Sequence, residues 1–145
     1  MRLHLAGHRF GIIDQDVVIW RDHVDRVTRT NPKCAPEIFY ELKAHFLAML
    51  TTDVRIWNAG RDGKRLARSL AANGIHIHAF IDIDPKKIGG VRRGNIPVVS
   101  NDSLTGPNDG PLIVIAVGIP RVRPEIRAEL IEKGYVEGHD FIFAA

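Results

Sequence analysis

The sequence lacks several features by which whole classes of protein are recognised. Cys34 is the single cysteine among 145 residues, which excludes an internal disulfide and favours a reducing, cytoplasmic compartment. No apolar run approaches the ~18 residues that a membrane-spanning helix needs, and the start does not resemble a signal peptide. The formal net charge of +3 is spread evenly, so nucleic acid is not an expected partner.

What is present suits a globular protein. Hydrophobic residues make up 45% of the chain and charged residues 26%, a balance typical of one ordinary core with or without an appendage. No repeat and no low-complexity segment interrupts the sequence. The organisation is therefore given by the spacing of the apolar residues and by the turn residues between them.

The stretch from Val54 to Asp84 predicts a strand, a tight turn, a helix and a second strand. Val54–Trp57 is extended and mostly apolar, and His76–Ile83 is a second strand. Between them, small or apolar residues recur at helical spacing on one face, at Gly63, Leu66, Ala67, Leu70 and Ala71. Asn73-Gly74 ends that helix, with glycine where a left-handed backbone is favoured. Two strands joined by a helix are expected to be parallel and buried.

The turn of this unit is close to the dinucleotide-binding fingerprint G-x-G-x-x-G. Gly60 and Gly63 occupy the second and third glycine positions, and Asn58 stands at the first. The first position needs a tight turn, often with positive φ, which Asn tolerates better than most residues. The second glycine lets a pyrophosphate approach the backbone, and the third lets the helix pack against the strand. We expect unpaired N–H groups at this corner to face an anion.

Other candidate cofactor-binding residues surround the turn. Arg61 and Lys64 follow it on the helix, where they would neutralise a phosphate. Asp82 and Asp84 come about 20 residues later, near the usual place of the acid that holds a ribose hydroxyl. Gly118 would allow close backbone approach in a third loop. Because ligands of such sheets bind beyond the carboxyl ends of the strands, we expect the three loops to meet.

The remaining segments continue the alternation of strands and helices. We expect strands over 96–99, 112–117 and 141–143, helices over 35–49 and 121–133, and a helical turn over 100–104. The alternation predicts an α/β fold, a three-layer Rossmann-like parallel sheet, over residues 51–145. Residues 1–50 are expected to form an appendage of two strands, Leu3–Ile13 and Val17–Trp20, followed by the first helix. Two strands alone are marginal in water, so they need a partner surface.

Two segments resemble parts of bacterial family 2 glycosyltransferases. The first covers roughly residues 53–145 and is similar to a Rossmann-like carboxyl-terminal domain of these enzymes, and to the nucleotide-sugar-binding domain of bacterial sugar acyltransferases. It is carried by WNAGRDGKRLARSL, AFIDIDPKKIGG, IPVVS, LIVIAVG and RAELIEKGY. The second resembles the end of the GT-A catalytic domain. There Arg21, His23 and Thr28-Arg29-Thr30 match an R-x-H and a Ser/Thr-Arg pattern.

The resemblance implies that residues 1–50 are the tail of a GT-A domain with a linker helix. A GT-A enzyme binds its nucleotide-sugar and divalent metal in an amino-terminal half that is not in this sequence, so no catalytic residue is assigned. His23 matches a histidine that completes such a metal site, but hard divalent ions need several oxygen ligands. The chain is therefore expected to be the carboxyl-terminal piece of a glycosyltransferase, which binds a nucleotide or nucleotide-sugar but does not transfer sugar alone.

Two other functions stay open. Asn58, Asp62 and the unpaired amino-terminal strands favour an assembly or docking module with an empty pocket, which would form a homodimer. A small NAD-dependent oxidoreductase is a further alternative. No Tyr-x-x-x-Lys pair or other proton donor accompanies the fingerprint, which weighs against it.

No metal site is predicted within this chain. His76 and His78 would share one face of a strand, but no cysteine or third histidine completes the pair. Asp82-Ile83-Asp84 is formally an Asp-x-Asp, yet an acid is expected there for ribose binding. Lys64 follows a glycine as in a P-loop, but Arg65 replaces the Ser/Thr that would hold Mg²⁺.

Overall fold

The computed structural model describes residues 6–9, 11, 13, 15–19, 21–92, 94–107 and 110–144. The chain divides into two compact units, Met1–Phe39 and Tyr40–Ala145. The functional boundary placed at residue 50 from the sequence stays a prediction. Within the described ranges, none of the helices has the length and apolar character required to cross a membrane.

The first unit contains short helical segments and no strand among its described residues. Helix α2 covers Val27–Thr30, the 3₁₀ helix η1 covers Pro32–Cys34, and α3 begins at Pro36. The prediction of two strands before residue 21 is wrong for residues 6–9, 11, 13 and 15–19, none of which is in a strand. The other residues of those two segments lie outside the described residues. Val17, Val18 and Ile19 are exposed. An apolar run without a facing sheet has no ladder partner, which is the physical reason for the difference.

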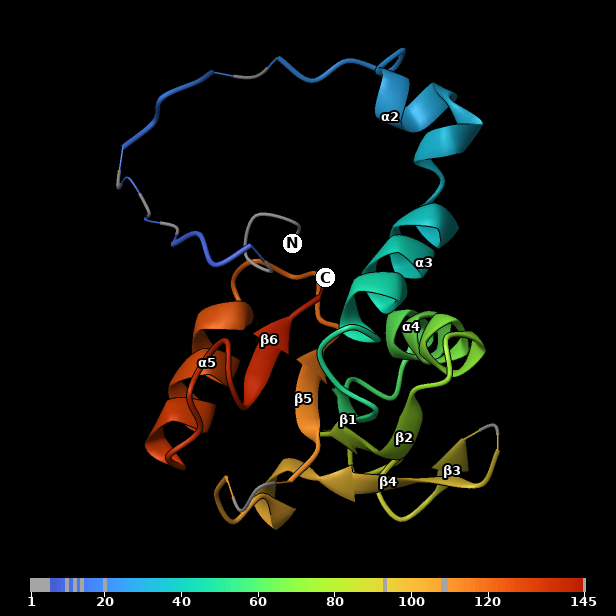
Figure 1. Ribbon diagram of the computed structural model, residues 1–145, viewed down its shortest axis with the longest axis vertical. Helices are drawn as coiled ribbons and strands as arrows, with labels where there is room; N and C mark the ends of the chain where they lie inside the picture. Colours follow the sequence, from blue (N-terminus) through green and yellow to red (C-terminus); the bar gives the residue numbers. More distant parts are fainter. Residues whose placement is uncertain are drawn as a thin grey trace. The chain divides into compact units, whose positions relative to one another are not determined.

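The second unit is built on a six-stranded sheet (Figure 1). Its strands are β1 (Asp53–Trp57), β2 (His76–Asp82), β3 (Val91–Arg92), β4 (Ile96–Ser100), β5 (Leu112–Ile115) and β6 (Phe141–Phe143). The spatial order is β3-β4-β2-β1-β5-β6, and every pair is parallel except β3 with β4. The predicted Rossmann-like α/β fold is confirmed, and the short antiparallel β3 is an addition that the sequence did not indicate.

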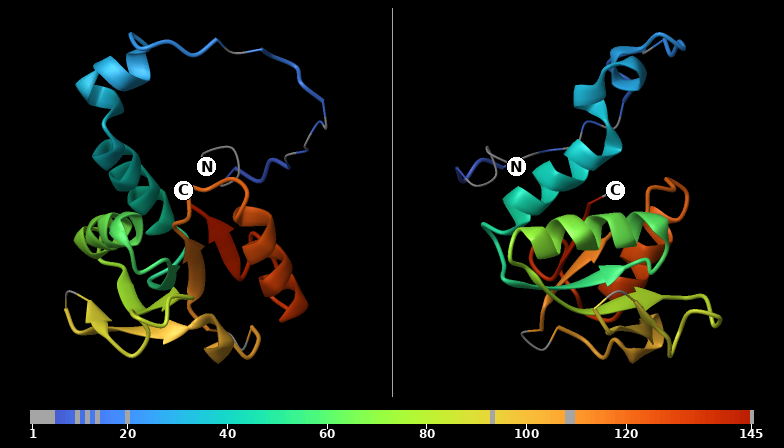
Figure 2. Two further views of the ribbon diagram at one scale, coloured as in Figure 1. Left: turned by 180° about the vertical axis from the view of Figure 1, so that it is seen from behind. Right: turned by 90° about the vertical axis from the view of Figure 1, so that its right-hand side faces the viewer.

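Helices cover both faces of this sheet. Helix α3 (Pro36–Leu47) ends on the same face as α4 (Arg61–Ala72), which lies over β1 and β2 (Figure 2). Leu66 and Leu70 of α4 are fully buried there against inward residues of β1 and β2. Helix α5 (Arg123–Glu132) packs Ile126 and Leu130 against the other face, with Trp57 and Phe141. The fold therefore has three layers.

The strand order reverses direction next to β1. From β1 the chain passes through α4 to β2 and then to β4, whereas β5 and β6 lie on the other side of β1. The connections that leave β1 and β5 therefore run to opposite faces of the sheet. In open α/β sheets such a reversal leaves a crevice at the carboxyl ends of the strands, and ligands bind there.

Candidate functional site

The turn between β1 and α4 has the geometry that the glycine positions predict. Asn58 adopts a φ of 111°, a region that L-residues other than Asn and Asp seldom enter. A Cβ on Gly63 would lie 1.7 Å from the main-chain oxygen of Asn58, so the helix packs on the turn at a distance that only glycine permits. Gly63 is therefore needed for the close approach of α4 to β1.

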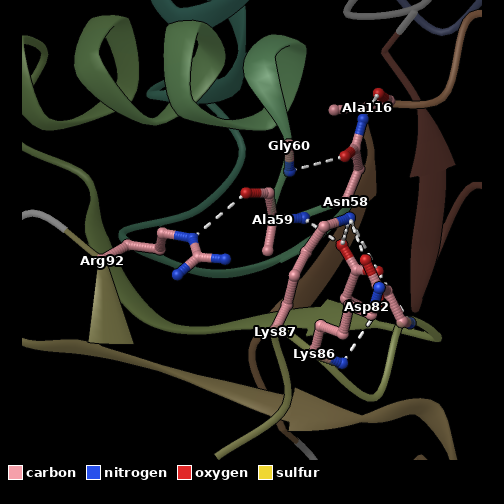
Figure 3. Close-up of polar contacts among 9 residues, drawn as sticks. Asn58, Ala59, Gly60, Asp82, Lys86, Lys87, Arg92 and Ala116 are labelled. Atoms are coloured by element: carbon pink, nitrogen blue, oxygen red, sulfur yellow. Dashed lines mark hydrogen bonds and ion pairs between the residues drawn. The ribbon is translucent and has the colours of Figure 1, made fainter. Parts of the chain in front are cut away.

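Two of the corner's N–H groups are already paired within the protein. The N–H of Gly60 donates to Oδ1 of Asn58 (2.7 Å), and the N–H of Ala59 donates to Oδ2 of Asp82 (2.8 Å) (Figure 3). The expectation that the whole corner exposes unpaired amides is therefore wrong. The reason is that asparagine, unlike glycine at the same position, brings its own acceptor to the turn.

The amino terminus of α4 remains available to an anion. Gly60 is the N-cap residue, and no side chain caps the helix. The N–H groups of the first turn have no partner inside an α-helix, and the helix dipole makes this end positive. Asp62 interacts with Tyr40 of α3; burial, the charge of Asp62 and a hydrogen bond to it raise the pKa of Tyr40. Arg61 and Lys64 are exposed on the same first turns.

Asp82 is a structural acid at the end of β2. Its side chain is buried and accepts the N–H groups of Ala59 and Asp84 and the ammonium of Lys87, at 2.8, 3.0 and 3.1 Å (Figure 3). Burial alone would raise the pKa of this carboxyl, but the two N–H groups and Lys87 outweigh it and lower the pKa. With its acceptor positions occupied, Asp82 fixes the β1 turn to the β2 turn.

Asp84 is the acid that faces outward. Its side chain is 39% exposed and lies 3.6 Å from Nζ of Lys87, while Oδ1 accepts the N–H of Lys86 at 3.0 Å. Of the two acids predicted to hold a ribose, Asp84 alone keeps a carboxylate oxygen that accepts no hydrogen bond from the described residues. Gly118 lies exposed in the loop after β5.

Sequence reasoning missed two basic residues of this region. Lys87 pairs with Asp82 at the end of β2 and with Asp84 beyond it, and Nε of Arg92 in β3 donates to the main-chain oxygen of Ala59 (3.2 Å). A lysine five residues beyond a strand-end aspartate was a usable signal for the first contact. Nothing local marked the second, because it depends on β3 folding back toward the β1 turn.

The reversal of the strand order coincides with the position of Asn58. Nδ2 of Asn58 donates to the main-chain oxygen of Ala116, just beyond β5, at 2.8 Å. The side chain thus spans the carboxyl ends of β1 and β5, where the crevice of a Rossmann-like sheet begins. The structure brings Asn58, Gly60, Gly63 and Asp82 together. Arg61, Lys64 and Gly118 are exposed, and Asp84 is half-buried.

A cavity of about 420 Å³ lies beside α4. Its apolar part comes from α4, β2 and β4, and three cations, Lys64, Arg68 and Arg92, line it without any acid. Among the described residues, no helix joins β2 to β4. Lys64 belongs both to this cavity and to the first turns of α4.

The fold and the switch-point geometry define a Rossmann-like α/β domain with a candidate anion site at the first helix. Among solved structures, the chain is similar to the crystal structure of RSP, a Rex-family repressor, at 16% identity and a TM-score of 0.51, over 81% of this chain and 64% of that one. RSP in complex with β-NAD⁺ and operator DNA and RSP in complex with β-NADH are also similar, each at 16% identity, a TM-score of 0.49 and 68% of this chain. The present chain spans 54–64% of the length of these structures.

No protein-family model matches the sequence, and no curated protein matches it. The expected glycosyltransferase relationship is therefore wrong: RSP, the structural neighbour at a TM-score of 0.51, is a Rex-family repressor, and no sequence match supports a transferase. The short motifs that carried the resemblance are those that many Rossmann-like domains need, since a tight glycine turn and a strand-end acid follow from the fold. The expectation that nucleic acid is not a partner is corrected as well: RSP, to which the fold is similar, also forms a complex with operator DNA.

Proposed function

We propose that the sheet domain binds a nucleotide through its phosphates at the amino terminus of α4, and that it is not an enzyme by itself. The observation that carries the proposal is an uncapped helix end, followed by Arg61 and Lys64, at the strand-order reversal. Anions bind at such helix ends because the N–H groups and the dipole both favour negative charge. RSP, whose fold is similar, binds NAD⁺ and NADH, so these dinucleotides are the first ligands to test.

The roles of the residues follow from their surroundings. The N–H groups of Arg61, Asp62 and Gly63 bind phosphate oxygens, and Lys64 supplies positive charge. Asp84 accepts a ribose hydroxyl, whereas Asp82 keeps its structural contacts to Ala59 and Lys87. Gly118 leaves room beside the phosphates in the loop after β5. Asn58 and Gly60 shape the turn.

Isothermal titration of the full chain with NAD⁺, NADH, ADP and UDP tests the proposal. We expect Lys64→Ala to weaken the binding of the dinucleotides. We expect Asp84→Asn to weaken the binding of nucleotides whose ribose hydroxyls are free. Arg68→Ala is a matched control, because it removes the same charge one turn further along α4. Failure of every nucleotide to bind, or an equal loss in Lys64→Ala and Arg68→Ala, would overturn the proposal.

A second candidate function is an assembly or docking domain. The specific observation in its favour is that Asn58 and Asp82 already occupy the N–H groups of Gly60 and Ala59. For this function we expect light scattering after size exclusion to show a homodimer whose mass does not depend on concentration. We expect titration calorimetry to show no heat on addition of any nucleotide. A monomer that binds nucleotide would rule it out.

Nucleic acid belongs among the partners to be tested, since a protein of similar fold binds operator DNA. Fluorescence anisotropy of labelled duplex DNA, with and without NADH, measures this directly over a range of salt concentrations. Binding that weakens steeply with salt would reflect phosphate contacts.

The cytoplasmic location expected from the single cysteine, Cys34, remains part of this proposal.

A further inference from the structure

Three potential metal ligands meet at the amino-terminal ends of β1 and β2. Asp53 begins β1, and the parallel register places it beside His76, the first residue of β2. His78 follows two residues later, so its side chain is on the same face of the strand as that of His76. Both histidines are exposed. This end of the sheet is opposite to the carboxyl ends, so the group is separate from the candidate nucleotide site.

The distances between these ligand atoms suit one small cation. Nε2 of His78 lies 2.9 Å from Oδ1 of Asp53, and Nδ1 of His76 lies 3.3 Å from the same oxygen. All three residues present a ligand atom within 4.8 Å of the others, and this is the one such group in the described part of the chain. In a tetrahedral site with bonds of about 2.0 Å, adjacent ligand atoms are about 3.3 Å apart. A cation therefore requires little movement of the side chains.

The carboxylate is held in the orientation that a metal needs. Oγ1 of Thr52 donates to Oδ2 of Asp53 at 2.6 Å, which leaves Oδ1 toward the two imidazoles. The two imidazole rings pack edge to face with centroids 4.4 Å apart, which limits their rotation.

We infer that Asp53, His76 and His78 form a binding site for a divalent transition-metal ion, for which Zn²⁺ is the best match, with water in the remaining coordination position. Two imidazoles and one carboxylate suit Zn²⁺ and its neighbours, whereas Mg²⁺ and Ca²⁺ prefer oxygen ligands alone. The cation takes the place of the proton on each ring nitrogen that faces Asp53; that proton moves to the other ring nitrogen or to water. The sequence showed only the two histidines of β2; the third ligand, Asp53, comes from the neighbouring strand β1.

Calorimetric titration of the full chain with Zn²⁺, and separately with Mg²⁺, tests the inference. We expect one Zn²⁺ per chain at this site and no heat with Mg²⁺. His78→Ala and Asp53→Asn should each lower Zn²⁺ affinity at least about tenfold, because a three-ligand site loses a third of its protein donors. His139→Ala is the matched control: His139 also lies 2.8 Å from an acid, Asp140, but belongs to no three-ligand group among the described residues.

A rescue variant separates metal binding from a simple ion pair. His78→Cys removes the contact with Asp53 but supplies a thiolate, which is a good zinc ligand, so affinity should recover relative to His78→Ala. With Co²⁺ as a spectroscopic substitute, the same variant should gain a sulfur-to-cobalt charge-transfer band. Circular dichroism checks that each variant is folded. Absence of Zn²⁺ binding, or equal affinity in wild type, His78→Ala and His139→Ala, would overturn the inference.

Discussion

The side-chain amide of Asn58 donates to the main-chain oxygen of Ala116 over 2.8 Å, and so ties together the ends of two strands that are distant in sequence. The oxygen of the same amide accepts the N–H of Gly60 at 2.7 Å, while the backbone of Asn58 is held at a φ of 111°. One residue thus tethers β1 to β5, occupies an amide of the turn and adopts an unfavourable conformation. A glycine would change all three properties.

Asn58→Gly should raise nucleotide affinity with little change in stability. The substitution removes two hydrogen bonds, each worth about 0.5–1.5 kcal/mol, and relieves a backbone conformation that costs about 1–2 kcal/mol in residues with a Cβ. These effects nearly cancel in the free energy of unfolding, which urea denaturation measures. The N–H of Gly60 becomes free for a phosphate oxygen, so we expect NAD⁺ affinity by calorimetry to increase about two- to tenfold.

Asn58→Ala is the control for this prediction. Alanine loses both hydrogen bonds but keeps the Cβ at positive φ, so the variant should be less stable than wild type by about 2 kcal/mol. Equal stabilities of Asn58→Gly and Asn58→Ala would show that the backbone conformation costs nothing. Increased stability of Asn58→Gly without increased nucleotide affinity would contradict the role given to the Gly60 amide.

Gly63→Ala should be among the most destabilising single-methyl changes in the chain. The added Cβ would lie 1.7 Å from the main-chain oxygen of Asn58, and a backbone atom cannot rotate away as a side chain does. Helix α4 must shift, and overpacking of this kind costs about 1–3 kcal/mol or more. Gly74→Ala provides the comparison: it has open space around it but a φ of 78°, so about 1–2 kcal/mol is expected. A smaller loss for Gly63→Ala than for Gly74→Ala, by thermal or urea unfolding, would contradict the packing argument.

The local parts of the fold could be predicted from the sequence because they depend on local patterns. The apolar spacing around Leu66 and Leu70 fixed the face that α4 buries, and Gly74 marked its end. The glycine turn and the strand-end acids could be expected to lie close together, because β1 and β2 are parallel and their carboxyl ends meet at one edge of the sheet. β3 was missed because two residues, Val91 and Arg92, are too few for a period to show.

Contacts between distant segments could not be predicted in the same way. The placement of Asp53 against His76 and His78 depends on the register of two parallel strands, which a single sequence does not reveal. Asparagine at position 58 was expected to tolerate the backbone of the turn. The hydrogen bond from the N–H of Gly60 to its side chain could not be predicted, because it depends on the side-chain rotamer. The apolar segment around Val18 has strand-like residues but pairs with no strand in the described part of the chain, so its composition was misleading.

Asp82→Asn should destabilise the sheet domain by about 1.5–3 kcal/mol, the range for hydrogen bonds to a charged group. The change weakens the acceptor for Ala59 and Asp84 and removes the charge that pairs with Lys87. Asp84→Asn is the matched control, since its side chain is more exposed and should cost less than about 1 kcal/mol. Similar losses in the two variants by urea denaturation would show that burial of Asp82 is not decisive.

The contribution of Asp82 should also depend on pH in a definite direction. Its pKa in the folded protein is lowered, so the unfolded chain takes up its proton first as the pH falls. The stabilisation is complete above the unfolded value of about 3.9 and is lost as the pH falls toward the folded value. Wild type and Asp82→Asn should therefore differ most at neutral pH and converge in acid. A difference that grows with acidification would contradict the lowered pKa.

A fragment of residues 36–145 should fold and bind nucleotide as the full chain does. Every residue of the two buried apolar clusters lies between Ala44 and Ala144, and Pro36 keeps the start of α3. The fragment loses Trp20, so its fluorescence reports Trp57, which is buried in the core. We expect the free energy of unfolding and the NAD⁺ affinity to match those of the full chain, within error. A fragment that is unfolded, or folded but unable to bind a nucleotide that the full chain binds, would show that residues 1–35 contribute to the sheet domain or to its site.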